Sequence, residues 1–93
     1  MLAAAASPPT YQITYAGGDG SSLEQAVLIK GAPDDGAGVK AEYLWVRAHY
    51  PSLKFDSRGF LSKSGRSYDT LDGDLSGEHR TFYFDISEFY KQP

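Results

Sequence analysis

The stretch RTFYFDI, residues 80–86, carries the clearest strand pattern in the chain. In an extended backbone Phe82, Phe84 and Ile86 point to one side, while Thr81, Tyr83 and Asp85 point to the other. This alternation predicts a strand that buries one face against a core. The partners of this strand have to come from the segments that precede it.

Two further strands are predicted immediately before it, over residues 53–63 and 66–75. Ser64-Gly65 separates them and favours a tight hairpin turn. A second turn at Ser76-Gly77-Glu78 leads into residues 80–86. These local hairpins favour antiparallel pairing.

The first half of the chain supplies the other elements. Residues 11–15 alternate and predict a strand with one buried face, and the apolar run 27–29 predicts a buried strand. One long helix is expected over residues 36–50, capped by Asp34 or Asp35 and ended by the following proline. The order β, turn, β, α, β, β, β predicts an α+β domain, with an antiparallel sheet of four to five strands packed on one principal helix.

Length and composition narrow the class of protein. A chain of 93 residues with 41% apolar and 23% charged residues fits one globular domain, which we place over residues 10–93. It has no cysteine, so disulfides and zinc–thiolate sites are excluded. The net charge is −3 and the nine Lys and Arg residues are scattered, which disfavours nucleic-acid binding. No apolar run is long enough to predict a membrane span.

The N-terminal stretch MLAAAASPP, residues 1–9, is expected to form a disordered tail. It is similar to the end of a signal peptide, where small residues precede the cleavage site, although it lacks the basic segment that begins one. A cloning remnant or a plain flexible tail explains it equally well. The signal-peptide interpretation slightly favours a periplasmic or secreted location over a cytoplasmic one.

The predicted helix has two apolar sides, which is unusual. On a helical wheel, Lys40 and Arg47 form one polar seam between these sides, and Glu42 and His49 form the other. A domain with one sheet can bury only one of the two sides. One side contains Val39, Tyr43, Val46 and Tyr50, and the other contains Ala41, Leu44, Trp45 and Ala48.

Two interpretations of the second side stay open. It is covered from within the chain, or it is an interaction surface for a protein partner or for a second copy in a homodimer. Trp and Tyr are enriched in interface hot spots, and alanines allow close approach of another backbone. The leading hypothesis is therefore a non-enzymatic interaction module whose surface is made of Ala41, Leu44, Trp45 and Ala48.

A glycine-rich loop carries the rival hypothesis, a small ligand-binding or hydrolase domain that uses this loop with Asp19, Ser21 and a histidine. Backbone N–H groups in such a loop can hold an anion, but the loop lacks the lysine of a P-loop. Alternatively the loop is a glycine turn, in which serines cap a short helical turn and an aspartate bonds its own backbone. The loop residues are Gly17, Gly18, Asp19, Gly20, Ser21 and Ser22.

Other polar motifs are weaker. The run DGDLSG, residues 72–77, matches the start of an EF-hand loop, but Tyr83 stands where the loop requires a bidentate Glu. A weak divalent site at Asp72, Asp74 and Glu78 stays open, as does a sugar- or peptide-binding sheet face at Tyr68, Tyr83 and Asp85. His49 and His79 belong to no catalytic motif. We therefore expect no catalytic residue, metal or cofactor.

The chain resembles a family of small uncharacterised bacterial proteins, often with an export signal. The resemblance covers most of residues 15–90 and implies a bacterial domain, with no activity or ligand attached to it. It rests on Tyr15-Ala16-Gly17-Gly18-Asp19-Gly20-Ser21-Ser22, Glu24, Ala26-Val27, Ala41-Glu42-Tyr43, Tyr50-Pro51, Tyr68-Asp69 and Tyr83-Phe84-Asp85-Ile86-Ser87.

Overall fold

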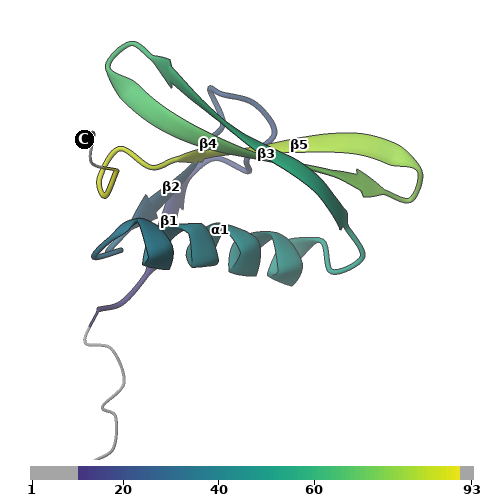
Figure 1. Cartoon of the computed structure of the whole chain (residues 1–93), viewed down its shortest axis with the longest axis horizontal. Helices are drawn as coiled ribbons and strands as arrows, with labels where there is room; N and C mark the ends of the chain where they lie inside the picture. Colours follow the sequence, from purple (N-terminus) through teal and green to yellow (C-terminus); the bar gives the residue numbers. More distant parts are fainter. Residues whose placement is uncertain (1–10, 91–93) are drawn as a thin grey trace, which may run out of the picture.

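The computed structural model describes residues 11–90 as five strands in one sheet and a single helix (Figure 1). The α+β class predicted from the sequence is confirmed. The expectations for residues 1–9 lie outside the described residues. The elements are β1 (Thr14–Gly17), β2 (Val27–Lys30), α1 (Asp35–His49), β3 (Lys54–Lys63), β4 (Arg66–Leu75) and β5 (Glu78–Asp85).

The sheet is mixed, which corrects the prediction of an antiparallel sheet. Its strand order is β1-β2-β5-β4-β3, and β2 pairs with β5 in parallel. The reason lies in the connections. Because α1 carries the chain back past the sheet, β3 runs in the same direction as β2, and the two hairpins that follow reverse the direction twice. β5 therefore reaches β2 in the parallel sense.

Both hairpins have two-residue turns; the first is the predicted Ser64-Gly65, whereas the second contains Ser76 and Gly77 without Glu78, which already pairs with Leu75 in β5. Ser64 and Gly65 have φ of 53° and 78°, and Ser76 and Gly77 have φ of 54° and 86°. Positive φ at both central residues is the type I′ geometry, whose twist matches that of paired strands. The strand after the second turn begins at Glu78, two residues before the pattern predicts.

The first strand differs from its prediction. β1 covers Thr14–Gly17 instead of residues 11–15, and all four of its residues are exposed because it lies at the edge of the sheet. Tyr15 is 40% exposed, and its hydroxyl donates to the backbone oxygen of Ala41 at 2.8 Å. This contact connects the edge strand to the middle of α1.

The core lies between the sheet and α1. Phe82, Phe84 and Ile86 are buried, which confirms the side predicted for them. Gly38 of α1 contacts the ring of Phe89, so the segment after β5 closes the core over the start of the helix. The buried apolar residues are Val27, Ile29, Ala41, Trp45, Val46, Leu53, Leu71, Phe82, Phe84, Ile86 and Phe89.

The helix has one broad buried face instead of two opposite apolar sides. Glu42, assigned to a polar seam, lies near its centre and is 0% exposed. The two predicted apolar sides are the flanks of this face, with Trp45 on one and Val46 on the other. Arg58 of β3 supplies this buried carboxyl with a hydrogen bond, because its Nη2 lies 3.2 Å from Glu42 Oε1; the same Nη2 forms an ion pair with Asp69 Oδ2 at 3.0 Å.

Candidate functional site

The four helix residues predicted as an interaction surface do not lie together on the outside. Ala41 and Trp45 are 2% and 8% exposed and belong to the core, whereas Leu44 is 54% exposed and Ala48 is exposed too. The prediction of one exposed surface around Trp45 is therefore wrong. Trp45 is covered from within the chain, in part by Phe82 and Phe84.

The glycine-rich loop forms a turn held by its own side chains. Asp19 Oδ1 accepts hydrogen bonds from the backbone N–H of Ser21 at 3.0 Å and from its hydroxyl at 2.6 Å. These bonds lower the pKa of the Asp19 carboxyl, so it is negatively charged at neutral pH. Ser22 Oγ accepts from the N–H of Gln25 at 3.2 Å, but the turn does not extend into a helix.

Gly20 anchors this loop against the core. Its φ is +81°, and its carbonyl accepts from the N–H of Tyr83 at 2.9 Å. A Cβ at this position would lie 3.3 to 3.7 Å from Val27, Trp45 and Phe82. The third glycine of the loop is therefore required by backbone conformation, and the loop is held beside the C-terminal half of α1.

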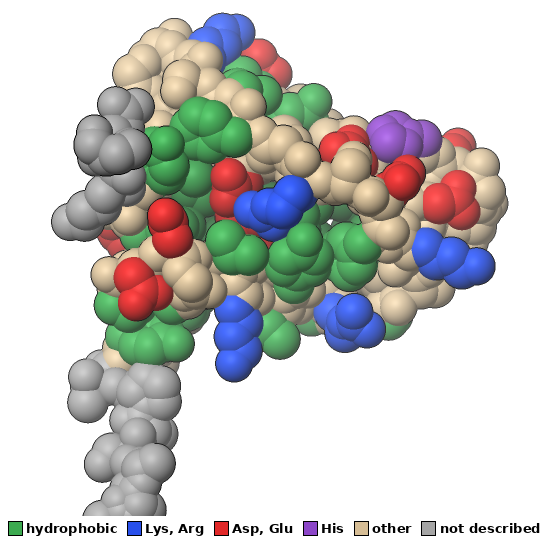
Figure 2. All heavy atoms as spheres, in the orientation of Figure 1, with side chains coloured by type: hydrophobic (Ala, Val, Ile, Leu, Met, Phe, Trp, Pro, Cys, Tyr) green, Lys and Arg blue, Asp and Glu red, His purple; other side chains and the backbone are tan. Residues whose placement is uncertain are grey.

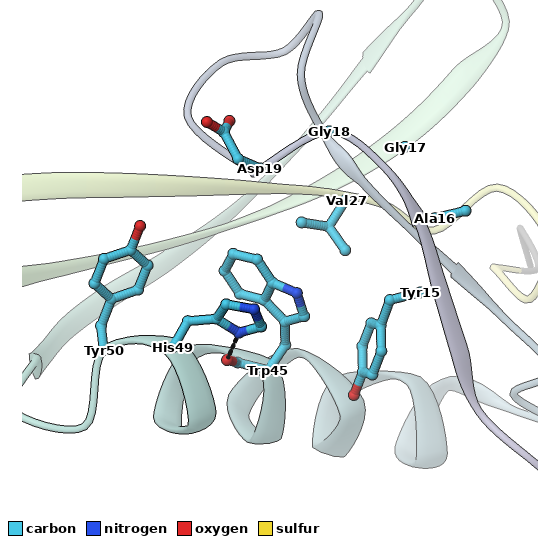
Figure 3. Close-up of a pocket in the computed structure, with 9 residues that line it drawn as sticks. All are labelled: Tyr15, Ala16, Gly17, Gly18, Asp19, Val27, Trp45, His49 and Tyr50. Atoms are coloured by element: carbon cyan, nitrogen blue, oxygen red, sulfur yellow. Dashed lines mark hydrogen bonds between the residues drawn. The ribbon is translucent and has the colours of Figure 1, made fainter.

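A cavity of about 300 Å³ lies between this loop and the helix (Figure 3). It brings together residues from both rival hypotheses, since three loop residues and Trp45 face the same space. Figure 3 shows the rings of Tyr50, His49 and Trp45 in a row along α1, with Tyr15 beside Trp45 at the end of the row away from Tyr50. The lining residues are Tyr15, Ala16, Gly17, Gly18, Asp19, Val27, Trp45, His49 and Tyr50.

His49 is oriented by the helix itself. Its Nδ1 lies 2.8 Å from the backbone oxygen of Trp45, and its ring stacks on the indole with centroids 4.1 Å apart. Because a carbonyl can only accept, Nδ1 carries the proton and Nε2 of the neutral ring is left as an acceptor. The cavity is thus lined by a stacked aromatic pair that carries one hydrogen-bonding nitrogen.

A second, more polar cavity of about 290 Å³ adjoins the first. Tyr50 and Asp19 line both, so the two spaces meet at these residues. The guanidinium of Arg80 lies 5.6 Å from the centre of the Tyr50 ring, in a cation–π contact. The second cavity is lined by Asp19, Ser21, Tyr50, His79, Arg80, Thr81, Phe82 and Tyr83.

In the described residues, no serine–histidine hydrogen bond connects the groups named in the hydrolase hypothesis. Ser21 shares the second cavity with His79, but its hydroxyl donates to Asp19 and makes no hydrogen bond to a histidine in the described residues. His79 Nε2 lies 3.3 Å from Asp72 instead. Within residues 11–90, no three His, Asp or Glu side chains are close enough to hold a metal, at Asp72, Asp74 and Glu78 or elsewhere.

The described part of the chain is thus an α+β domain with one mixed sheet and two neighbouring cavities, both lined by Tyr50 at the C-terminal end of α1. A scan against family models and searches of curated proteins and of solved structures find no match to it. The resemblance to small bacterial proteins stays a prediction.

Among residues 11–90 no helix is both long and apolar enough to span a membrane. On the face shown in Figure 2, Lys and Arg side chains are scattered instead of forming one basic patch.

Sequence reasoning missed His49, Tyr50 and Tyr15 as cavity residues. The spacing of Trp45 and His49 could have revealed two of the walls, because residues four apart stack on one side of a helix. No sequence signal places Tyr15 beside Trp45, because the position of Tyr15 depends on where the edge strand β1 crosses α1.

Proposed function

We propose that this protein is a ligand-binding domain that holds a flat apolar group in the cavity between the glycine-rich loop and α1. The observation that supports it is the meeting of four aromatic rings and the loop around a space of about 300 Å³. Small-molecule sites are concave, mostly apolar, and carry a few placed polar groups. Here Trp45, His49 and Tyr50 supply the apolar walls, and His49 Nε2 supplies an acceptor.

The loop fits this role better than the role of an anion nest. The Asp19 carboxylate is negative and belongs to the loop itself, so an anion at the loop would meet like charge. Gly17 and Gly18 instead let the loop lie against the segment before β2, because a Cβ on Gly17 would be 2.6 Å from the backbone oxygen of Ala26. A Cβ on Gly18 would collide with the backbone of Gln25, so glycine keeps the loop narrow.

The interaction-module hypothesis has weaker support. With Trp45 and Ala41 in the core, Leu44 and Ala48 are the exposed members of the proposed surface. Stable protein interfaces bury roughly 800 Å² on each partner, and two side chains supply a small part of that area. The cavity is therefore the better-supported site.

Trp45 is the only tryptophan of the chain, so its fluorescence reports on this cavity. We expect p-cresol, a flat ring with one hydroxyl donor, to change the fluorescence saturably, with a dissociation constant of about millimolar order. His49→Ala removes the stacked ring and should weaken binding at least about fivefold. No saturable change at any concentration would contradict the proposal.

Leu44→Ala is the matched control, since Leu44 is exposed on the same helix and does not line the cavity. It should bind p-cresol as the wild type does. Equal weakening by both variants would show that the fluorescence change does not come from the cavity. Circular dichroism of both variants confirms that each remains folded.

A further inference from the structure

One edge of β5 is open beside the second cavity. On the β4 side β5 is paired along its whole length, from Leu75↔Glu78 to Tyr68↔Asp85. On its other side it pairs with β2 only at Phe84 and Asp85. Within residues 11–90, the first half of β5 therefore has no neighbouring strand on that side.

The orientation of the free backbone groups follows from one hydrogen bond. The N–H of Tyr83 donates to Gly20 O, on the side away from β4. Backbone groups of alternate residues face the same side of a strand, so the N–H and C=O of Thr81 and His79 also face away from β4. These residues line the second cavity, where their backbone groups are available to a ligand.

The loop marks where an added strand would end. Gly20 already occupies the position opposite Tyr83, so the open stretch covers His79 to Thr81. An added strand lies about 4.8 Å from its neighbour, and successive side chains point to opposite faces of the sheet. One of its side chains would face the helix side, where Tyr50 and Phe82 line the second cavity and Tyr50 also lines the first.

We infer that the ligand is an extended peptide that adds a short strand to β5 at His79–Thr81 and places an aromatic side chain beside Tyr50, in the cavity that Trp45 and His49 also line. Main-chain hydrogen bonds would supply affinity, and the aromatic cavity would supply selectivity, as in other cases of strand addition. This inference rests on the proposed function, because the side chain occupies the same cavity. It also adds what a simple ring pocket does not need, an open backbone edge beside the cavity.

In the described part of the chain, the outer edge of β3 has no neighbouring strand either, but β3 contributes no residue to the aromatic cavity. Around the turn at Ser64-Gly65, Lys63 and Arg66 form the hydrogen-bonded pair, so the N–H of Ser62 faces outward. Ser62 thus carries the same kind of free N–H as Thr81 without the cavity. It provides the matched control position.

The probe is a capped pentapeptide with a central phenylalanine flanked by threonines, titrated against the full chain. Trp45 fluorescence reports whether the phenylalanine ring enters the cavity, and amide hydrogen exchange reports whether the peptide backbone pairs with β5. We expect saturable binding, slower exchange of the Thr81 N–H, and binding at least about tenfold weaker for the same peptide with N-methylated backbone amides, since methylation removes its donors. Equal affinity of the two peptides, with unchanged exchange at Thr81, would overturn the strand-addition inference.

Thr81→Pro and Ser62→Pro test the protein side. Each proline removes one outward N–H and keeps the backbone ladder to β4, because neither N–H bonds to β4. Thr81→Pro also loses the hydroxyl that donates to Asp72 of β4, so Thr81→Val, which keeps the N–H, is measured beside it and should bind the peptide as the wild type does. Thr81→Pro should weaken peptide binding about tenfold and leave p-cresol binding unchanged, whereas Ser62→Pro should change neither. If p-cresol binds and both proline variants hold the peptide as the wild type does, the inference fails and the cavity proposal stands. If neither probe binds the wild type, the proposed function fails as well.

Discussion

Glu42 is the residue whose environment differs most from what its type suggests. Burial raises the pKa of its carboxyl to about 9, with Asp69 adding to the increase and Arg58 opposing it. Its Oε2 atom is buried and has no hydrogen-bond partner in the described residues. At neutral pH the folded protein therefore holds Glu42 protonated beside an Arg58–Asp69 ion pair.

This pKa predicts how stability depends on pH. The unfolded chain releases the Glu42 proton near the ordinary value of 4.5, whereas the folded chain keeps it until about pH 9. Unfolding between these values releases a proton, so this group makes the free energy of unfolding decrease as pH rises through that window. Below about pH 4.5 the Glu42 carboxyl is protonated in both states, so it does not change the free energy of unfolding.

Glu42→Gln removes the titration and keeps an oxygen that accepts from Arg58. The free energy of unfolding of the variant, relative to that of the wild type, should be higher at about pH 8 than at about pH 5. The reason is that the wild type loses stability over this range, and each pKa unit of difference between folded and unfolded states corresponds to about 1.4 kcal/mol. Urea unfolding at the two pH values measures it. Exposed Glu24→Gln is the control and should follow the wild type. Parallel pH curves for the wild type and Glu42→Gln would contradict the assignment.

At the scale of the element, α1 depends on the absence of a side chain at Gly38. A Cβ there would lie 2.1 to 2.8 Å from three ring carbons of Phe89, whereas a Cβ at Gly36 would have Asp34 Oδ1 as its nearest atom, 3.6 Å away. Alanine favours helix at both positions by roughly 1 kcal/mol relative to glycine. The two glycines therefore separate intrinsic helix preference from packing.

Gly38→Ala should destabilise the domain by about 1–3 kcal/mol, because Phe89 has to leave its place over the helix. Gly36→Ala should be neutral or stabilising by up to about 1 kcal/mol. Thermal and urea unfolding of both variants provide the comparison. A stabilised Gly38→Ala protein would mean that Phe89 does not pack on the helix in solution.

At the scale of the whole molecule, we expect a monomer. One broad face of α1 is covered by the sheet and by the chain after β5, which leaves Leu44 as the large apolar residue exposed on the helix. Sedimentation equilibrium of the wild type should give the mass of one chain. A stable dimer would restore the interaction-module hypothesis.

Trp45→Asp distinguishes a core residue from an interface residue. Placing a charge among Phe82 and Phe84 costs several kcal/mol, so we expect loss of the cooperative unfolding transition. Leu44→Asp should stay folded with an unchanged mass. A folded, monomeric Trp45→Asp protein derived from a dimeric wild type would contradict the assignment of Trp45 to the core.

Local patterns were sufficient to predict the elements from β2 to β5, whereas β1 lies later in the chain than its pattern predicts. Alternation over residues 80–86, the turns at Ser64-Gly65 and Ser76-Gly77, and the cap before α1 each act within a few residues, and the structure confirms them. The Asp34 side chain accepts from the N–H of Ala37, as expected of a cap. Such features depend on backbone preferences that neighbouring residues set, so they can be inferred without the rest of the fold.

The parallel β2–β5 pair, the burial of Glu42 and the cavity were decided only by tertiary structure. Each depends on segments far apart in the chain: β2 meets β5 across 57 residues at Val27↔Phe84, and Arg58 reaches Glu42 from a strand that follows the helix. A helical wheel places Glu42 and His49 in a seam but does not show which partners face that seam. The partners depend on where the sheet crosses the helix. Because of this crossing, Glu42 lies in the core and His49 lines the cavity.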